Sequence, residues 1–226
     1  MKLLKYSIVG IGALMLVLST MSVSAETIPD GTNDIYHITW VNDEWTATVS
    51  TDARPNIDIT QLASSFEDKN LTLTLTVAGT IQNSSKIVYY ILFNTSDTML
   101  MVAYYSELKM AAGFSMSNPL QPIIGEVVVS ADEKSIIATI PLNTTTEPTA
   151  LNFTGWAWEY PVNFSSADQS YQGEWWGDWA PDSGLTFKIN TSSNENNNGT
   201  TKTPGFEAVL AIAAIGAALI ILKRRK

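Results

Sequence analysis

The sequence predicts an all-β protein, an antiparallel β-sandwich. Residues 71–77 read LTLTLTV, and this strict alternation is typical of a strand with one face on a core and the other in water. Further short runs rich in β-branched and aromatic residues follow at short intervals, separated by Gly, Pro, Asn and Asp. No long stretch between residues 35 and 189 has helical periodicity. Many short strands without helices favour a sandwich of two antiparallel sheets.

The expected strands differ in how many of their faces are apolar. Residues 87–93 and 99–105 are apolar on both faces, which is typical of strands that are buried on both sides. Residues 125–129 and 136–140 flank the polar segment 130–135 and predict a hairpin. The expected strands, in chain order, are residues 35–41, 45–50, 71–77, 87–93, 99–105, 125–129, 136–140, 153–160 and 185–190.

The N-terminus has the pattern of a secretory signal peptide. Lys2 and Lys5 precede an apolar run at residues 8–18, and Val23, Ser24 and Ala25 provide small residues before a cut at Glu26. We therefore expect a signal peptide over residues 1–25. The alternative is an uncleaved N-terminal anchor, although the apolar run is shorter than the ~20 residues that a membrane span needs. Both interpretations predict export.

The composition excludes two classes of function. The chain contains no cysteine, so no disulfide stabilises the fold and no thiol takes part in chemistry. Residues 26–205 contain 21 acidic and seven basic residues, which gives this segment a formal charge of −14. Such a surface repels phosphate backbones, so we expect no nucleic acid partner.

Eight N-x-S/T sequons predict N-glycosylation of the exported segment. Its 15 asparagines would produce about three to four sequons by chance, given its share of Ser and Thr. The alternative is a polar β-protein, rich in Asn and Thr, that accumulates sequons passively. The sequons begin at Asn70, Asn83, Asn94, Asn143, Asn152, Asn163, Asn190 and Asn198.

The C-terminus predicts a membrane anchor. Residues 190–203 form a polar, Asn/Thr-rich linker with no residue to bury. Residues 208–222 are apolar and would extend about 22 Å as a helix, against a hydrocarbon thickness of about 30 Å. With Phe206 and Glu207 included, we expect one transmembrane helix over about residues 206–222. The basic residues 223–226 place the C-terminus in the cytoplasm, so residues 26–189 form an extracellular domain.

The tail resembles a known sorting signal. The triplet Pro204, Gly205 and Phe206 directly precedes the apolar run, and a basic cluster ends the chain. This order resembles the PGF-CTERM signal of archaeal surface proteins. The resemblance implies recognition by an archaeosortase-like enzyme, cleavage near the triplet and attachment to a membrane lipid, within residues 204–226. It also implies a cell-surface location on the outer side of the membrane. The alternative is an ordinary single-pass anchor.

A second, weaker resemblance concerns residues 30–190. Residues 55–60 (PNIDIT), the run at 71–77 and residues 178–182 (DWAPD) are similar to CBM9-like or DOMON-like sandwich domains. The resemblance implies the sandwich fold and ligand binding. A DOMON-type cofactor would need axial ligands, which one histidine and scattered methionines hardly provide.

Aromatic residues are concentrated late in the chain, where residues 156–179 contain five of the seven tryptophans. Alternation places Trp156, Trp158 and Tyr160 on one face of a strand. We expect these rings to pack between the sheets; the alternative is an exposed row that stacks on sugar rings. Residues 173–184 are expected to form a structured loop because of their glycines and proline. The candidate ligand-binding residues are Trp156, Trp158, Tyr160, Trp175, Trp176 and Trp179.

The same loop is a candidate metal site. Glu174, Asp178 and Asp182 could converge on Ca²⁺, because hard cations bind several oxygen ligands. The alternative is that these carboxylates cap the loop by hydrogen bonds. Asp52, Asp58 and Asp168 are weaker candidates of the same kind. No other cofactor is expected.

We expect no enzymatic activity. Nucleophilic catalysis needs a base, but His37 is the only histidine and lies in an expected strand. Residues 113–117 (GFSMS) fail the G-x-S-x-G pattern at the last position. Glu159 with Glu174 or Asp178 remains as a possible pair for glycoside hydrolysis.

Two functions remain open. The first is a structural, non-catalytic role in the cell envelope, for example in an S-layer, together with other envelope proteins. The second is a carbohydrate-binding surface module, with a polysaccharide as its partner and a possible dependence on Ca²⁺.

Overall fold

The structure is a computed structural model that describes residues 24–41, 44–106, 108–163 and 173–182. Within these residues it has twelve strands, all paired antiparallel, and no α-helix. The strands are β1 (Ser24–Pro29), β2 (Tyr36–Val41), β3 (Glu44–Val49), β4 (Ile59–Glu67), β5 (Asn70–Val77), β6 (Ile87–Asn94), β7 (Thr98–Tyr105), β8 (Leu108–Ser115), β9 (Asn118–Val129), β10 (Ser135–Pro141), β11 (Asn152–Glu159) and β12 (Gly173–Ala180).

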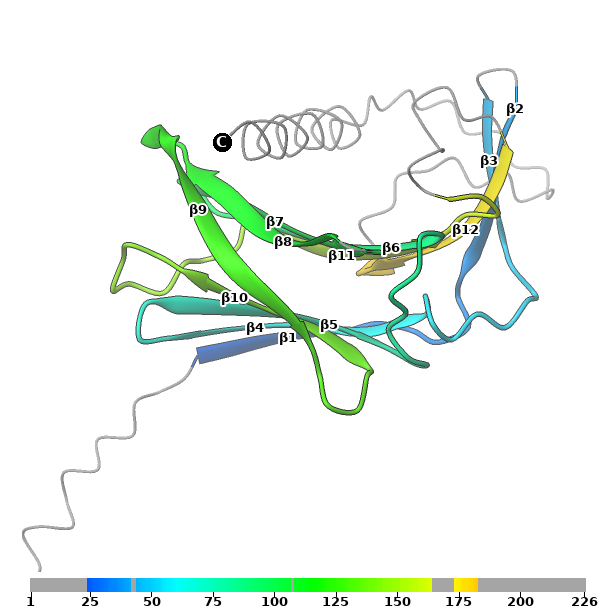
Figure 1. The fold of residues 1–226 in the computed structure, drawn as a ribbon, viewed down its shortest axis with the longest axis horizontal. Helices are drawn as coiled ribbons and strands as arrows, with labels where there is room; N and C mark the ends of the chain where they lie inside the picture. Colours follow the sequence, from blue (N-terminus) through cyan, green and yellow to red (C-terminus); the bar gives the residue numbers. More distant parts are fainter. Residues whose placement is uncertain (1–23, 42–43, 107, 164–172, 183–226) are drawn as a thin grey trace, which may run out of the picture.

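The strands form two layers, so the predicted antiparallel β-sandwich is confirmed (Figure 1). The order of hydrogen-bonded neighbours is β1-β4-β5-β10-β9-β8-β7-β6-β11-β12-β2-β3. One layer, here called sheet A, consists of β1, β4, β5 and β10. The other layer, called sheet B, consists of β8, β7, β6, β11, β12, β2 and β3. Strand β9 belongs to both layers.

Strand β9 connects the layers because its two halves have different partners. Ile124 and Gly125 pair with β8 of sheet B, whereas residues 126–129 pair with β10 of sheet A. Gly125 stands where the strand passes from one sheet to the other. A Cβ atom there would lie 2.5 Å from the carbonyl oxygen of Thr139, so only glycine allows the close backbone approach.

The main hydrophobic core fills the space between the sheets. The alternation predicted for β5 is confirmed, because its apolar residues are buried and its threonines are half-buried. Leu73 and Leu75 of sheet A are fully buried, and Tyr89, Phe93 and Leu100 of sheet B face them in the same cluster. Each such buried side chain contributes roughly 1.5–3 kcal/mol to folding.

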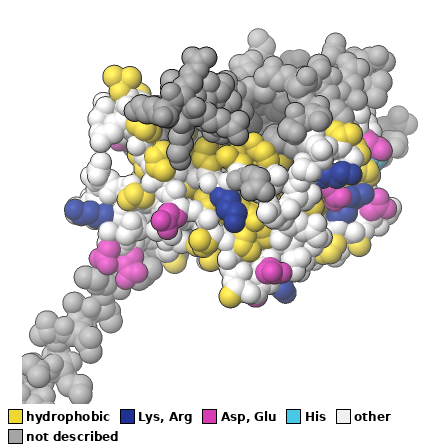
Figure 2. Space-filling model, viewed as in Figure 1, with side chains coloured by type: hydrophobic (Ala, Val, Ile, Leu, Met, Phe, Trp, Pro, Cys, Tyr) yellow, Lys and Arg dark blue, Asp and Glu magenta, His cyan; other side chains and the backbone are white. Residues whose placement is uncertain are grey.

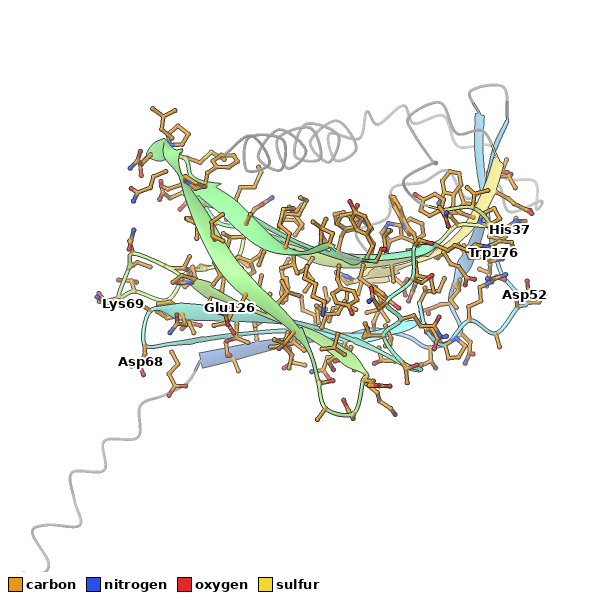
Figure 3. All side chains as sticks on the ribbon, viewed as in Figure 1. His37, Asp52, Asp68, Lys69, Glu126 and Trp176 are labelled. Carbon is orange, nitrogen blue, oxygen red and sulfur yellow. The ribbon has the colours of Figure 1, made fainter. Side chains whose placement is uncertain are left out.

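The β4–β5 hairpin fixes the register of sheet A. Its two connecting residues, Asp68 and Lys69, have φ angles of 49° and 66° (Figure 3). Two consecutive positive φ angles in a two-residue loop match the right-handed twist of the flanking strands. This turn places Leu62 opposite Leu75, both on the core side.

Several expectations about elements need correction. Residues 173–180 form strand β12, not a loop, and pair with both β11 and β2. Strands β1, β4 and β8 were not expected, and β9 begins at Asn118 rather than at residue 125.

Some predicted elements lie outside the described residues: the strand at 185–190, the linker 190–203 and the tail 204–226. The expected signal peptide lies outside them too, except for Ser24 and Ala25, which begin β1. No helix among the described residues is long and apolar enough to cross a membrane.

Candidate functional site

Strand β11 presents different residues to the two sides of sheet B. Phe153 and Ala157 belong to the core between the sheets, and Gly155 lies against Leu62 of sheet A. Trp156, Trp158 and Tyr160 alternate with them and therefore lie on the outer face of sheet B. The expectation that these three rings pack between the sheets is wrong. They are packed, since Trp156 is 6% and Tyr160 7% exposed, but on the opposite side of the sheet.

The rings on this face form what we call the outer aromatic cluster, visible as the rings above sheet B in Figure 3. Tyr160 stacks on Trp175 with ring centroids 5.9 Å apart, and Trp158 lies edge-on to Trp179 at 6.1 Å. Gly177 leaves room for the Trp158 ring, because a Cβ atom there would lie 2.6 Å from Trp158 Cδ1. The cluster consists of Tyr36, Tyr90, Trp156, Trp158, Tyr160, Trp175 and Trp179.

Two indole groups in this cluster lack a hydrogen-bond acceptor within the described part of the chain. The Nε1 atoms of Trp156 and Trp158 are both buried and unpaired there. Indole N–H groups usually find a partner when they are buried. An acceptor from outside the described residues would satisfy them.

Trp176 is separated from the other candidate tryptophans, because it points to the inner side of sheet B. The ring of His37 stacks on it (Figure 3), with ring centroids 4.9 Å apart. The Arg54 guanidinium lies 3.7 Å from the centroid of the Trp176 ring. Arg54 also forms an ion pair with Glu159 at 2.7 Å, and His37 pairs with Glu174 at 2.9 Å. Glu174 therefore faces His37 and does not join the other predicted metal ligands.

Five aspartates gather at a different place, and we call them the aspartate cluster. Asp30 and Asp34 follow β1, Asp58 directly precedes β4, Asp178 lies in β12 and Asp182 follows it. One carboxylate oxygen from each of Asp34, Asp58 and Asp178 lies within 4.8 Å of the others. The structure thus brings together two of the three predicted metal ligands, Asp178 and Asp182, and adds three others. Of the weaker candidates, only Asp58 joins them; Asp52 pairs with Arg54, and Asp168 lies outside the described residues.

Backbone amides hold two of these carboxylates in place. Asp178 Oδ2 accepts a hydrogen bond from the N–H of Ile59 at 2.6 Å, and its Oδ1 accepts one from Trp179 at 2.9 Å. Asp58 Oδ2 accepts one from the N–H of Asn33 at 3.0 Å. Gly31 lies so close to Asp34 that a Cβ atom would fall 2.1 Å from its Oδ2. Three separate segments are therefore folded tightly around one group of carboxylates.

Burial and mutual repulsion raise the pKa values of four members of this cluster. Burial, together with the charges of Asp34 and Asp30, raises the pKa of Asp178 to about 8, although the hydrogen bonds from Ile59 and Trp179 act in the opposite direction. Burial and the charge of Asp182 raise the pKa of Asp30 to about 7. Burial also raises the pKa values of Asp58 and Asp182, with a smaller contribution from Asp34 in each case. Among the described residues, no basic side chain forms an ion pair with any of these aspartates. The cluster is therefore short of positive charge.

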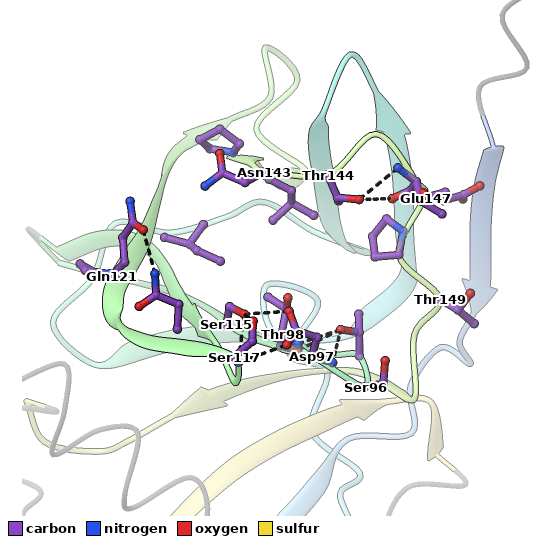
Figure 4. Close-up of a pocket in the computed structure, with 18 of the residues that line it drawn as sticks. Ser96, Asp97, Thr98, Ser115, Ser117, Gln121, Asn143, Thr144, Glu147 and Thr149 are labelled. Carbon is purple, nitrogen blue, oxygen red and sulfur yellow. Dashed lines mark hydrogen bonds between the residues drawn. The ribbon is translucent and has the colours of Figure 1, made fainter.

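A polar hollow of about 750 Å³ lies beside the β6–β7 and β8–β9 turns (Figure 4). Ser115 Oγ donates to Asp97 Oδ2 at 2.7 Å and lies 2.7 Å from the hydroxyl of Ser117. The hydrogen bond from Ser115, with smaller contributions from hydrogen bonds from Ser117, lowers the pKa of Asp97, because these donors stabilise the carboxylate. These hydrogen bonds tie the two turns together, and Ser115 has no histidine beside it within the described chain.

Six of the eight sequon asparagines lie in the described residues. Asn70 and Asn94 are half-buried in strands, and Asn94 pairs in register with Asn152. Asn190 and Asn198 lie outside the described residues. The exposed sequon asparagines are Asn83, Asn143, Asn152 and Asn163.

The comparisons with known proteins concern the C-terminus. Residues 203–226 match the PGF-CTERM motif. The chain carries a PGF-CTERM tail. No curated protein and no solved structure matches the chain, so the resemblance to CBM9-like or DOMON-like domains is not confirmed.

The PGF-CTERM tail indicates the cellular location of the protein. A protein with this tail is a cell-surface protein that is anchored at the membrane and processed at its C-terminus by an archaeosortase. Strand β12 is the last described strand, and the chain continues from it through residues 183–202 to the tail.

The charged side chains are mixed on the visible surface of the described residues. On the face seen in Figure 2, acidic and basic side chains are dispersed and form no large patch of one sign.

Proposed function

We propose that this PGF-CTERM protein is a non-catalytic, N-glycosylated component of the archaeal cell envelope. The PGF-CTERM match carries the proposal, because it defines the location and the anchor. Four sequon asparagines are exposed on the sandwich, where a glycan can be attached without unfolding a strand. The glycans would form a polar layer around a domain that has no disulfide to stabilise it.

The placement of the titratable side chains supports a non-catalytic role. His37 is stacked on Trp176 and paired with Glu174, so it does not face a nucleophile within the described residues. Glu159 is bound by Arg54, and Asp178 is buried and held by two backbone amides. Each carboxylate suggested for glycoside hydrolysis therefore already has a structural partner.

We expect glycans on exposed sequons of the native protein and fewer on half-buried ones. Glycopeptide mapping of the protein from its own cells should find modified Asn83, Asn143, Asn152 and Asn163. The substitution Asn83→Gln should reduce the intact mass by one glycan. The matched substitution Asn94→Gln should leave the glycan mass unchanged, because Asn94 is half-buried opposite Asn152. Unmodified asparagine at all four exposed sequons would refute the glycosylation.

Carbohydrate binding is a second candidate, and one observation favours it. The outer aromatic cluster lies on the outer face of sheet B, and the rings of Trp158 and Trp179 are half-buried rather than fully buried. The unpaired Nε1 atoms of Trp156 and Trp158 could donate to sugar hydroxyls. Apolar sugar faces and hydroxyl acceptors together match such a surface.

Binding of the full chain to a panel of polysaccharides, with and without Ca²⁺, tests this candidate. We expect Trp158→Ala to weaken binding about tenfold, the free energy of roughly one ring contact. Trp176→Ala is the matched control, because Trp176 lies on the inner side of the sheet. Thermal melting of both variants checks that they remain folded. Absence of binding across the panel, or equal losses in the two variants, would count against a sugar site.

A further inference from the structure

The aspartate cluster contains a buried oxygen atom that no described residue satisfies. Asp58 is only 2% exposed, yet its Oδ1 atom has no hydrogen-bond partner. Asp34 Oδ1 and Asp30 Oδ2 are likewise buried and unpaired. An unsatisfied buried carboxylate oxygen costs several kcal/mol unless it meets a proton donor or a cation. The arrangement therefore calls for a positive partner at this point.

The distances suit a single ion bound between three carboxylates. Oxygen ligands lie about 2.3–2.6 Å from Ca²⁺, so two ligands of one ion are separated by no more than about 5 Å. The ligand oxygens of Asp34, Asp58 and Asp178 all lie within 4.8 Å of one another. Asp178 keeps free lone pairs on both oxygens after accepting its two backbone hydrogen bonds.

The donor set points to a hard cation. Every ligand is a carboxylate oxygen, the chain has no cysteine, and its one histidine is stacked on Trp176 away from the cluster. Oxygen-only sites suit Ca²⁺ or Mg²⁺, whereas Zn²⁺ and Cu²⁺ prefer sites with imidazole or thiolate. Ca²⁺ accepts irregular geometry and loses its water readily, whereas Mg²⁺ demands a near-ideal octahedron. A buried, asymmetric group of aspartates from separate segments fits Ca²⁺ better.

We propose that Asp34, Asp58 and Asp178 bind one calcium ion, with Asp30 and Asp182 beside it as further carboxylates. The ion connects the loop between β1 and β2, the start of β4 in sheet A and strand β12 in sheet B. It therefore clamps the two layers at the strand from which the chain continues to its membrane tail. Its role is structural, and it does not depend on whether the protein carries glycans or binds sugars.

The competing explanation is a cluster that shares protons and binds no ion. In this explanation Asp182 and Asp34 share a proton, since burial and then the neighbouring Asp34 carboxylate raise the pKa of Asp182. The two explanations predict different responses of the native protein to Ca²⁺. If an ion binds, Asp58→Asn removes a ligand and abolishes the response to Ca²⁺. If only protons are shared, Ca²⁺ has no effect on the native protein in the first place.

Thermal melting of the full chain in detergent separates the two. After removal of metal with EGTA, we expect 5 mM CaCl₂ to raise the Tm by about 5 °C or more, because the ion binds the folded state alone. MgCl₂ at the same concentration, and therefore the same ionic strength, should give less than half of that shift. NaCl brings the metal-free sample to the same ionic strength. Isothermal titration calorimetry with CaCl₂ should give one site per chain.

Four variants make the test specific. Asp58→Asn and Asp34→Asn should lose the Ca²⁺-dependent shift. In EGTA, Asp58→Asn should melt no lower than the native chain, because it removes a buried charge and keeps the acceptor for Asn33. Glu174→Gln and Asp132→Asn should retain the full shift, because Glu174 faces His37 and Asp132 is exposed in the β9–β10 turn. A native chain without a Ca²⁺ shift overturns the proposal, as does a shift that Asp58→Asn and Asp34→Asn retain.

Discussion

Replacing Pro204, Gly205 and Phe206 together with alanine is expected to leave the C-terminal tail on the mature protein. The PGF-CTERM match places the processing signal at residues 203–226, and these three residues are its polar-to-apolar boundary. Alanine removes the fixed φ of proline, the small glycine and the phenylalanine ring that an enzyme could recognise there. The apolar run 208–222 stays intact, so the variant should still be found with the membranes.

Intact mass and C-terminal peptide mapping measure this result. In the native protein, peptides from residues 208–226 should be absent from the mature form; in the triple variant they should be present. The matched control replaces Asn194, Asn196 and Asn197 with alanine, which alters the linker but preserves the sequons at Asn190 and Asn198. The control should be processed like the native chain. A tail that is still removed from the triple variant would contradict the assignment of the signal.

The sequence predicts strands well where their pattern is local. Strands β5, β6, β7 and β10 are recognisable because each is a run of apolar or alternating residues whose side chains meet one core. Strand β12 is not recognisable, because Gly173, Gly177 and Asp178 are residues that strands usually avoid. Two of these residues have a reason that only the fold reveals. Gly177 accommodates the Trp158 ring, and Asp178 accepts the N–H of Ile59.

The residues of the candidate sites are likewise predictable from the sequence only where the pattern is local. Asp178 and Asp182 are close in the sequence, so an acidic loop predicts them as partners. Asp58 joins them only because β4 and β12 lie in facing layers, and the bond between Ile59 and Asp178 spans 119 positions. Glu174 is nearer to Asp178 in the sequence than Asp58 is, but it points to His37. For Trp156 and Trp158, alternation predicts a shared face but cannot tell the inner side of a sheet from the outer one.

Gly155 illustrates a position whose role is spatial rather than conformational. A glycine in a strand can mark a bulge, but residues 152–159 of β11 pair with β6 without interruption. A Cβ atom at Gly155 would instead lie 2.6 Å from Leu62 Cδ2 and 3.1 Å from Leu75 Cδ1. Sheet A thus approaches β11 so closely that the inner side of this strand holds only Gly155 and Ala157 beside its end residues.

Gly155→Val is therefore expected to destabilise the sandwich by about 1–3 kcal/mol, the usual cost of overpacking a core. Leu62→Ala should cost about 2–5 kcal/mol, because Leu62 is fully buried and leaves a cavity. In the double variant the valine occupies part of that cavity. Its loss should fall short of the sum of the single losses by about 1 kcal/mol or more. Urea unfolding of the full chain in detergent gives the three free energies of unfolding.

The neighbouring substitution Thr154→Val is the control for this cycle. Thr154 lies on the same strand but points to the outer side of sheet B and is half-buried, so its replacement should change stability by no more than about 0.5 kcal/mol. Losses at Gly155 and Leu62 that simply add would mean that the two side chains do not compete for one space. In that case the close approach of sheet A to β11 is not what requires glycine at residue 155.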